Sequence, residues 1–192
     1  MRKLYIIAGP NGAGKTTASY TILPEIFKCK EFINADEIAR GISPFNPDRV
    51  AIQAGKIMLR RINELLDGNI TFAIETTLAA KNLIKYIHKA KEKEYEIILL
   101  FLNLDSEELA IKRVETRVKE GGHNIPKETI IRRYKNGLKN FFQIYVQVVD
   151  KWIMVDNSDK VFHFIAEGFK KEVYVTDEKK WENLIREYDE KK

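Results

Sequence analysis

The chain has 192 residues, of which 44% are hydrophobic and 32% charged, a composition typical of a globular α/β domain with a sizeable core. Its only cysteine, Cys29, excludes an intramolecular disulfide, and its apolar runs are too short to span a membrane. We therefore expect a single cytoplasmic domain over residues 1–192. The net charge of +5 is concentrated between Lys112 and Lys139, where nine basic and three acidic residues predict an anionic ligand.

The first predicted strand, residues 3–8, leads directly into a P-loop pattern. Glycines allow successive backbone N–H groups to surround phosphate oxygens, and the helix expected behind them, running towards Pro24, adds partial positive charge. Lys15 would reach the β- and γ-phosphates, and the Thr16 hydroxyl would bind Mg²⁺. The pattern therefore predicts binding of ATP with Mg²⁺ by a run of nine residues: Gly9, Pro10, Asn11, Gly12, Ala13, Gly14, Lys15, Thr16 and Thr17.

The segments that follow alternate between strand and helix patterns. Ser106 is expected to N-cap one helix, and Gly68 is expected to end another as a C′ glycine. Alternating elements predict an α/β fold with a three-layer parallel sheet and right-handed crossovers. Strands are predicted near residues 32–34, 70–75, 97–102 and 152–155, helices at about 48–67, 80–93, 106–120 and 126–150, and a small C-terminal hairpin plus helix after residue 160.

Polar residues follow the predicted strands at their carboxyl ends, where parallel sheets bind ligands. The second strand ends at Asp36 and the third at Glu75, with Thr77 close behind. Phosphoryl transfer needs Mg²⁺, cationic side chains and a carboxylate that orients or deprotonates the acceptor hydroxyl. We assign Asp36 as that base, the alternatives being a helix cap or a contact to a magnesium-bound water. Glu75 and Thr77 are expected to bind the acceptor, and a water-mediated magnesium contact is the alternative for Glu75.

Residues 106–150 are predicted to form a basic helical lid. Arg113 and Arg117 lie four positions apart and therefore share one helix face. Arg132 and Arg133 follow in the next helix, and at least one of these four is expected to contact the γ-phosphate. Ordinary surface salt bridges are the alternative for the others. The predicted catalytic set is Asp36, Lys15, Arg113, Arg117 and Arg133.

Missing motifs narrow the functional class. The chain lacks the Asn-Lys-x-Asp motif of GTPases and the Leu-Ser-Gly-Gly-Gln signature of transporter ATPases, and it is short for an AAA+ module. An ATP-dependent small-molecule kinase remains. An antibiotic or nucleoside phosphotransferase is an alternative, as is an ATP-gated nucleic-acid-binding module. Acceptor-site carboxylates and the few aromatic residues among the basic ones argue against nucleic acid.

Three runs of the chain resemble the zeta toxin family: residues 8–17, 34–39 and 72–78. The later run Gly121-Gly122-His123-Asn124-Ile125-Pro126 resembles the family's small chromosomal branch. The resemblance implies a P-loop kinase fold, phosphorylation of the 3′-hydroxyl of the amino sugar in UDP-N-acetylglucosamine, and a small helical antitoxin that obstructs the ATP site. By motif position it also implies Asp36 as the catalytic aspartate, Glu75 and Thr77 as substrate-binding residues, and Lys15 as the Walker lysine.

One motif departs from the family pattern. Plasmid toxins read Glu-Gly-Thr-Leu-Arg at the substrate strand, whereas this chain reads Glu75-Thr76-Thr77-Leu78-Ala79. The arginine is missing, and a threonine replaces the glycine. The departure implies that the pocket around the UDP part of an acceptor is built differently here.

Overall fold

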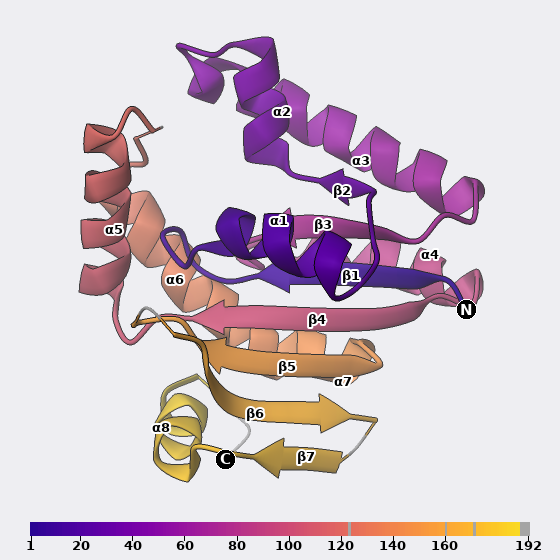
Figure 1. Ribbon diagram of the computed structural model, residues 1–192, viewed down its shortest axis with the longest axis vertical. Coiled ribbons are helices and arrows are strands. Elements are labelled where there is room, and N and C mark those ends of the chain that lie inside the picture. The colour runs from indigo at the N-terminus through magenta and orange to yellow at the C-terminus, as the bar shows by residue number, and fades with distance from the viewer. Residues whose placement is uncertain (123, 160, 171, 189–192) are drawn as a thin grey trace.

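One mixed sheet organises the computed structural model, which describes residues 1–122, 124–159, 161–170 and 172–188. In the described part of the chain the strand order is β2-β3-β1-β4-β5-β6-β7 (Figure 1). The first five strands in this order run parallel, β6 runs antiparallel to β5, and β7 runs antiparallel to β6. The strands are β1 (Lys3–Ala8), β2 (Phe32–Ile33), β3 (Phe72–Thr76), β4 (Glu96–Asn103), β5 (Lys151–Asp156), β6 (His163–Phe169) and β7 (Glu172–Val175).

Helices cover both faces of this sheet, as predicted for a three-layer fold. In Figure 1, α1 lies in front of β1 and β3, whereas α4, α6 and α7 lie behind the strands. Within the described residues, no helix is both long enough and apolar enough to cross a membrane. The helices are α1 (Lys15–Glu25), α2 (Ala35–Ile42), α3 (Ala51–Asp67), α4 (Ile84–Glu92), α5 (Glu107–Lys119), α6 (Lys127–Asn140), α7 (Val146–Val148) and α8 (Glu178–Tyr188), with a 3-10 turn at Pro47–Val50 and a π-helical turn at Phe141–Tyr145.

The core lies on both faces of the central strands β1 and β4. Leu4 and Ile6 on one face of the sheet, and Ile7 and Leu102 on the other, are at most 1% exposed, which explains why these strands read as continuous apolar runs. The register between strands then determines which side chains lie at the carboxyl edge of the sheet, beside the P-loop. Glu75 pairs with Ile7 of β1, two residues before the P-loop begins, so its side chain emerges beside the loop.

Three sequence predictions need correction in their details. Gly68 follows the last residue of α3 but keeps a right-handed φ of −77°, and Asn69 takes the left-handed conformation at φ 55°. The helix predicted over residues 126–150 is interrupted by the π-helical turn at Phe141–Tyr145. The predicted C-terminal hairpin is present, but the sheet predicted as parallel is mixed, because β6 pairs antiparallel with β5. The predicted Ser106 cap is confirmed, since its hydroxyl accepts the N–H of Leu109 at 3.2 Å.

Helix α6 and the π-helical turn hold the loop that follows β3. Asn140 Nδ2 donates to the carbonyl of Leu78 at 2.7 Å, and the Tyr145 hydroxyl donates to the carbonyl of Ala80 at 3.1 Å. Leu78 is fully buried and adopts φ 56°, a conformation that a bulky residue keeps only when its surroundings enforce it. Gly137 lets the helix approach this loop, because a Cβ there would lie 2.5 Å from the Thr77 carbonyl oxygen.

Gly137→Ala is therefore expected to destabilise the fold by about 2–3 kcal/mol, because the added methyl group must displace a backbone carbonyl. Gly55→Ala on α3 is the matched control, since a Cβ there meets nothing within 4 Å. The control is expected to stabilise the helix by about 0.5–1 kcal/mol. Urea unfolding midpoints of the two variants measure the difference, and equal midpoints would contradict the close approach of α6 to the loop.

Candidate active site

The P-loop is shaped by glycines that other residues could not replace. Gly9 has φ 143°, and a Cβ on it would lie 2.3 Å from the carbonyl oxygen of Leu102. Gly14 precedes α1 with φ 77° in the left-handed region. The side chain of Lys15, the first residue of α1, folds back over the loop and donates to the Pro10 carbonyl at 2.9 Å. Left-handed glycines and a buried ammonium over the loop are what phosphate binding by a P-loop requires.

Thr16 and Glu75 meet directly beside the P-loop. The Thr16 hydroxyl lies 2.9 Å from Glu75 Oε2 and 3.1 Å from Oε1. Lys15 Nζ lies 3.9 Å from the same carboxylate, and Asn34 Nδ2 donates to it at 2.8 Å. Asn34 reaches Glu75 because β2 and β3 are in register, with Ile33 level with Ile74. Two strand ends and the P-loop therefore form one hydrogen-bonded cluster.

The Lys15–Glu75 pair is nearly inaccessible to solvent, and this governs its charges. Burial lowers the pKa of Lys15, and the negative charges of Glu75 and Asp36 oppose that shift. Burial likewise raises the pKa of the Glu75 carboxyl, against the charge of Lys15 and the hydrogen bond from Thr16. Each charge therefore depends on the other for compensation.

Asp36 lies in the first turn of α2, a helix that the sequence analysis did not predict. Asn34 caps this helix, its Oδ1 accepting the backbone N–H groups of Asp36 at 2.8 Å and Glu37 at 3.3 Å. The side-chain amide of Asn34 therefore links the two carboxylate residues, because its Oδ1 accepts from Asp36 and its Nδ2 donates to Glu75. The sequence carried the signal for this, an Asn followed by two acidic residues, which is typical of a helix N-terminus.

A cleft of about 700 Å³ opens over the P-loop, and a smaller cavity of about 210 Å³ continues from it. The residues that line both are Lys15, Ala35, Asp36, Glu75 and Arg133. Thr77 lines only the smaller cavity, together with apolar side chains such as Met58 and Leu83. The smaller cavity is below the roughly 300–1,000 Å³ of a drug-sized site, so it suits the hydroxyl-bearing end of an acceptor.

The predicted P-loop residues divide into two groups in this geometry. Gly9, Pro10 and Ala13 are buried and shape the loop from behind. The others face the cleft, Asn11 also contacting the arginine side of the site. The cleft-facing members of the run are Asn11, Gly12, Gly14, Lys15, Thr16 and Thr17.

All four candidate arginines line the large cleft, but their surroundings differ. Arg113 donates to the carbonyls of Asn157 and Ser158, both at 2.7 Å, so its guanidinium is committed to backbone oxygens. Arg133 Nη1 donates to Asn11 Oδ1 at 3.3 Å and also lines the smaller cavity. Arg117 and Arg133 are close enough that their charges act on the pKa of Lys15. Arg133 therefore lies nearest the junction of the two spaces.

Comparison with known proteins decides the family. The family model of the zeta toxins matches residues 2–167. The chain belongs to the zeta toxin family. A Haemophilus influenzae protein without an assigned function is 30% identical over 132 residues, covering 69% of this chain and 92% of that one. This family member therefore keeps the predicted P-loop kinase fold.

Solved structures resemble this zeta family member along most of its length. The AvrRxo1-ORF1:ORF2 structure with ATP has a TM-score of 0.78 at 15% identity, covering 96% of this chain. This chain spans only 63% of that protein. A structure from the PezAT chromosomal toxin–antitoxin system of Streptococcus pneumoniae has a TM-score of 0.71 at 16% identity, covering 100% of this chain and 80% of that one.

One contact in this zeta-family site was not predicted from the sequence, and one residue of interest lies outside the described part of the chain. Asn157 donates from Nδ2 to the carbonyl of Ala13 at 2.8 Å, bringing the turn after β5 against the P-loop. No spacing in the sequence signals this contact, because the two residues are far apart in the chain. His123 of the Gly-Gly-His-Asn turn lies outside the described residues.

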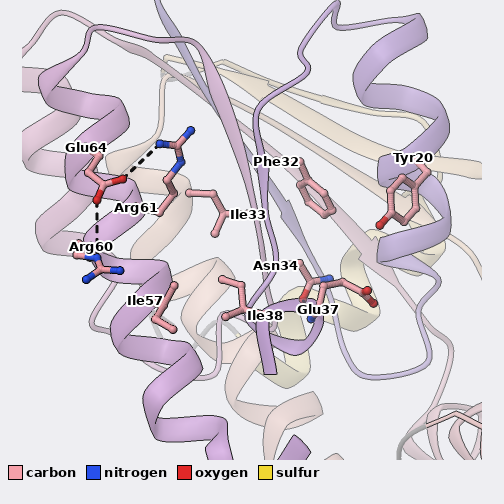
Figure 2. A pocket seen from close by; sticks show the side chains of 10 residues that line it. All are labelled: Tyr20, Phe32, Ile33, Asn34, Glu37, Ile38, Ile57, Arg60, Arg61 and Glu64. Atoms are coloured by element: carbon pink, nitrogen blue, oxygen red, sulfur yellow. Dashed lines mark hydrogen bonds and ion pairs between the residues drawn. The ribbon is translucent and has the colours of Figure 1, made fainter. Parts of the chain in front are cut away.

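A further hollow of about 440 Å³ lies beside β2 in this zeta-family fold (Figure 2). Tyr20 and Phe32 line one side of it, and α3 contributes the other. Two arginines of α3, Arg60 and Arg61, pair there with Glu64 at 3.7 and 3.3 Å. The described residues that line this hollow include none from the P-loop.

Proposed function

We propose that this chain is an ATP-dependent kinase that transfers the γ-phosphate of ATP to a hydroxyl of a small molecule. The first candidate acceptor is a UDP-amino sugar such as UDP-N-acetylglucosamine, by analogy with the family. One observation carries the proposal: Lys15, Asp36, Glu75 and Arg133 line both the P-loop cleft and the smaller cavity. Phosphoryl transfer needs a cation, a base and a transferring group at such a junction.

The P-loop would hold the triphosphate through its backbone N–H groups, with Lys15 on the β- and γ-phosphates. Oxygen donors beside the loop, Thr16 and the Glu75 carboxylate, are the kind that Mg²⁺ prefers, so the site fits the metal. Thr16 would bind Mg²⁺, which neutralises phosphate charge when present. Glu75 currently bonds Thr16, and this supports a contact to a magnesium-bound water alongside its proposed role in acceptor binding.

In the proposed reaction the acceptor hydroxyl lies in the smaller cavity, close to Asp36 and Thr77. Its oxygen forms a bond to the γ-phosphorus while the bond from that phosphorus to the β,γ-bridging oxygen breaks, and ADP leaves. Asp36 accepts the hydroxyl proton. Glu75 and Thr77 hold the acceptor so that this oxygen lies in line with the leaving group.

Arginines would stabilise the charge that spreads over the transferring phosphoryl group. We assign this role to Arg133, because it lines both spaces, and to Arg117, whose charge acts on Lys15. Arg113 is also part of the proposed catalytic set, but its bonds to two carbonyls support a role in fixing the P-loop.

The proposal also covers a partner protein, the domain organisation and the cellular location. Because the chain belongs to the zeta toxin family, and one similar structure comes from a toxin–antitoxin system, we infer a small helical antitoxin that covers the ATP cleft. We also infer a single cytoplasmic domain in which α5 and α6 serve as the basic lid. Glu75 and Asp36 in the cleft support a small acceptor over nucleic acid, since carboxylates repel a polyanion.

Phosphoryl transfer from γ-labelled ATP to a panel of UDP-sugars tests the proposal. Label on UDP-N-acetylglucosamine that is lost in Asp36→Asn is the expected result. Label on another sugar, a nucleoside or an antibiotic would keep the kinase and replace the acceptor. ATP binding without labelling of any acceptor, combined with RNA or DNA binding that falls steeply with salt, would favour a nucleic-acid-binding module instead.

A further inference from the structure

Helix α8 lies beyond residue 167, where the match to the zeta toxin family ends. Side-chain contacts nevertheless hold this helix against the sheet. Trp181 stacks on Trp152 of β5 with ring centroids 5.4 Å apart and also packs against Phe142 at 5.3 Å. Asp177 Oδ1 accepts the backbone N–H of Lys180 at 3.0 Å at the start of the helix. The first turn of α8, which carries Lys180, is therefore fixed against the sheet.

The Lys180 ammonium joins two strand ends. Nζ lies 2.6 Å from Asp105 Oδ1, just after β4, and also bonds Asp156 Oδ2 at the end of β5. Asp156 is only 4% exposed, and a buried carboxylate needs a compensating partner. Burial favours the neutral acid, but the hydrogen bonds from Lys180 and Ser158 hold the pKa of Asp156 below its ordinary value. Lys180 is thus the counter-charge of this group.

The turn that begins at Asp156 lies against the P-loop. Asp156 Oδ1 accepts the backbone N–H of Ser158 at 2.9 Å, which shapes the turn. Asn157 Nδ2 donates to the carbonyl of Ala13 at 2.8 Å, and a Cβ on Gly14 would come within 2.9 Å of that same nitrogen. Arg113 ties the turn to Gly12 as well, with Nη1 3.5 Å from its carbonyl. The turn therefore braces the P-loop from behind.

We propose that Lys180 is a positioning residue for the nucleotide site, acting through Asp156 and the turn that braces the P-loop. The inference rests on the proposed function only in taking ATP as the nucleotide. Without Lys180, Asp156 is a buried charge without its ammonium partner, and the turn relaxes. The loop N–H groups then lose their alignment on phosphate, whereas Asp36, Glu75 and Thr77 are not touched. ATP affinity falls, and acceptor binding does not.

Direct measurement of ATP binding by calorimetry, without any acceptor, tests this role. Lys180→Met keeps the aliphatic stem and is expected to raise the dissociation constant of ATP by roughly 5- to 30-fold. Lys180→Arg should stay within about threefold of wild type, because a guanidinium can still pair with both carboxylates. Lys179→Met, at an exposed neighbouring position on α8, is the matched control and should leave affinity unchanged.

A double-mutant cycle separates this role from a general loss of stability. Asp156→Asn keeps an oxygen for Ser158 but removes the carboxylate charge that pairs with Lys180, so it should weaken ATP binding on its own. Adding Lys180→Met to it should then cost little more, because the two residues act through one contact. All affinities are measured well below the melting temperature of each variant, and Asp156→Asn supplies the comparison if Lys180→Met does not fold.

If the wild-type protein binds ATP, either of two results would overturn the role of Lys180 and leave the proposed function standing. One is an ATP affinity of Lys180→Met within twofold of wild type, and the other is full additivity in the cycle. A further sign is kinetic: the KM for ATP should rise while the KM for the acceptor stays constant. Wild-type protein that binds no ATP would overturn the proposed function and this inference together.

Discussion

Asp36→Asn is expected to lower turnover by roughly 10²–10⁴-fold while the affinity for ATP stays within about threefold of wild type. The substitution keeps the size of the side chain and the start of α2, because Asn34 caps that helix through backbone N–H groups. What it removes is one of the two carboxylates that line both the cleft and the smaller cavity, the other being Glu75. The effect should therefore appear in kcat, measured with saturating ATP and a labelled acceptor.

Glu37→Gln is the matched control for this experiment. Glu37 is the next residue of α2, also lines the cleft and also carries a carboxylate, but it does not line the smaller cavity. We expect its turnover to stay within about twofold of wild type. Equal losses in the two variants would indicate a general electrostatic effect, and normal turnover in Asp36→Asn would remove the base from our mechanism.

Lys15→Met is expected to reduce turnover by roughly 10³-fold and to weaken ATP binding as well. Lys15 is 7% exposed, and its ammonium donates to the Pro10 carbonyl over the P-loop, so its charge acts in a site largely closed to water. Its loss leaves the Glu75 carboxylate buried without its cation. Labelled-acceptor assays and ATP calorimetry on the same preparation report both effects.

A second variant separates loss of catalysis from loss of folding. In Lys15→Met with Glu75→Gln the uncompensated charge is gone, so thermal stability should recover towards wild type, whereas turnover should not. Lys56→Met, at an exposed position on α3, controls for loss of a lysine in general. Turnover near the wild-type value in the double variant would show that the P-loop cation is not part of the chemistry.

Local signals in the sequence predicted the parts of the fold that depend on neighbouring residues. The P-loop, the apolar run of β4 and the Ser106 cap are of this kind, because each rests on spacing within one element. The convergence of Asp36 and Glu75 was predictable too, since the carboxyl ends of parallel strands meet at one edge.

Features that depend on contacts between distant segments were not predictable. Glu75 bonds Thr16 because of the β1–β3 register, and the guanidinium of Arg113 lies on the turn after β5 because of how α5 packs. The direction of the C-terminal hairpin also follows from pairing with β5, which no local pattern encodes. The left-handed residue after α3 is Asn69 and not Gly68, a choice made by the path of the chain into β3.

Helix α6 contacts both halves of the site, through Arg133 on the P-loop side and through Gly137 and Asn140 on the loop that carries Thr77. In the proposed mechanism this one helix would therefore set the spacing between the phosphate donor and the acceptor. A movement of α6 would then shift both halves of the site together, because the helix contacts both. Occupancy of either half should accordingly order the other, so that the two substrates bind with positive synergy in whichever sequence they arrive.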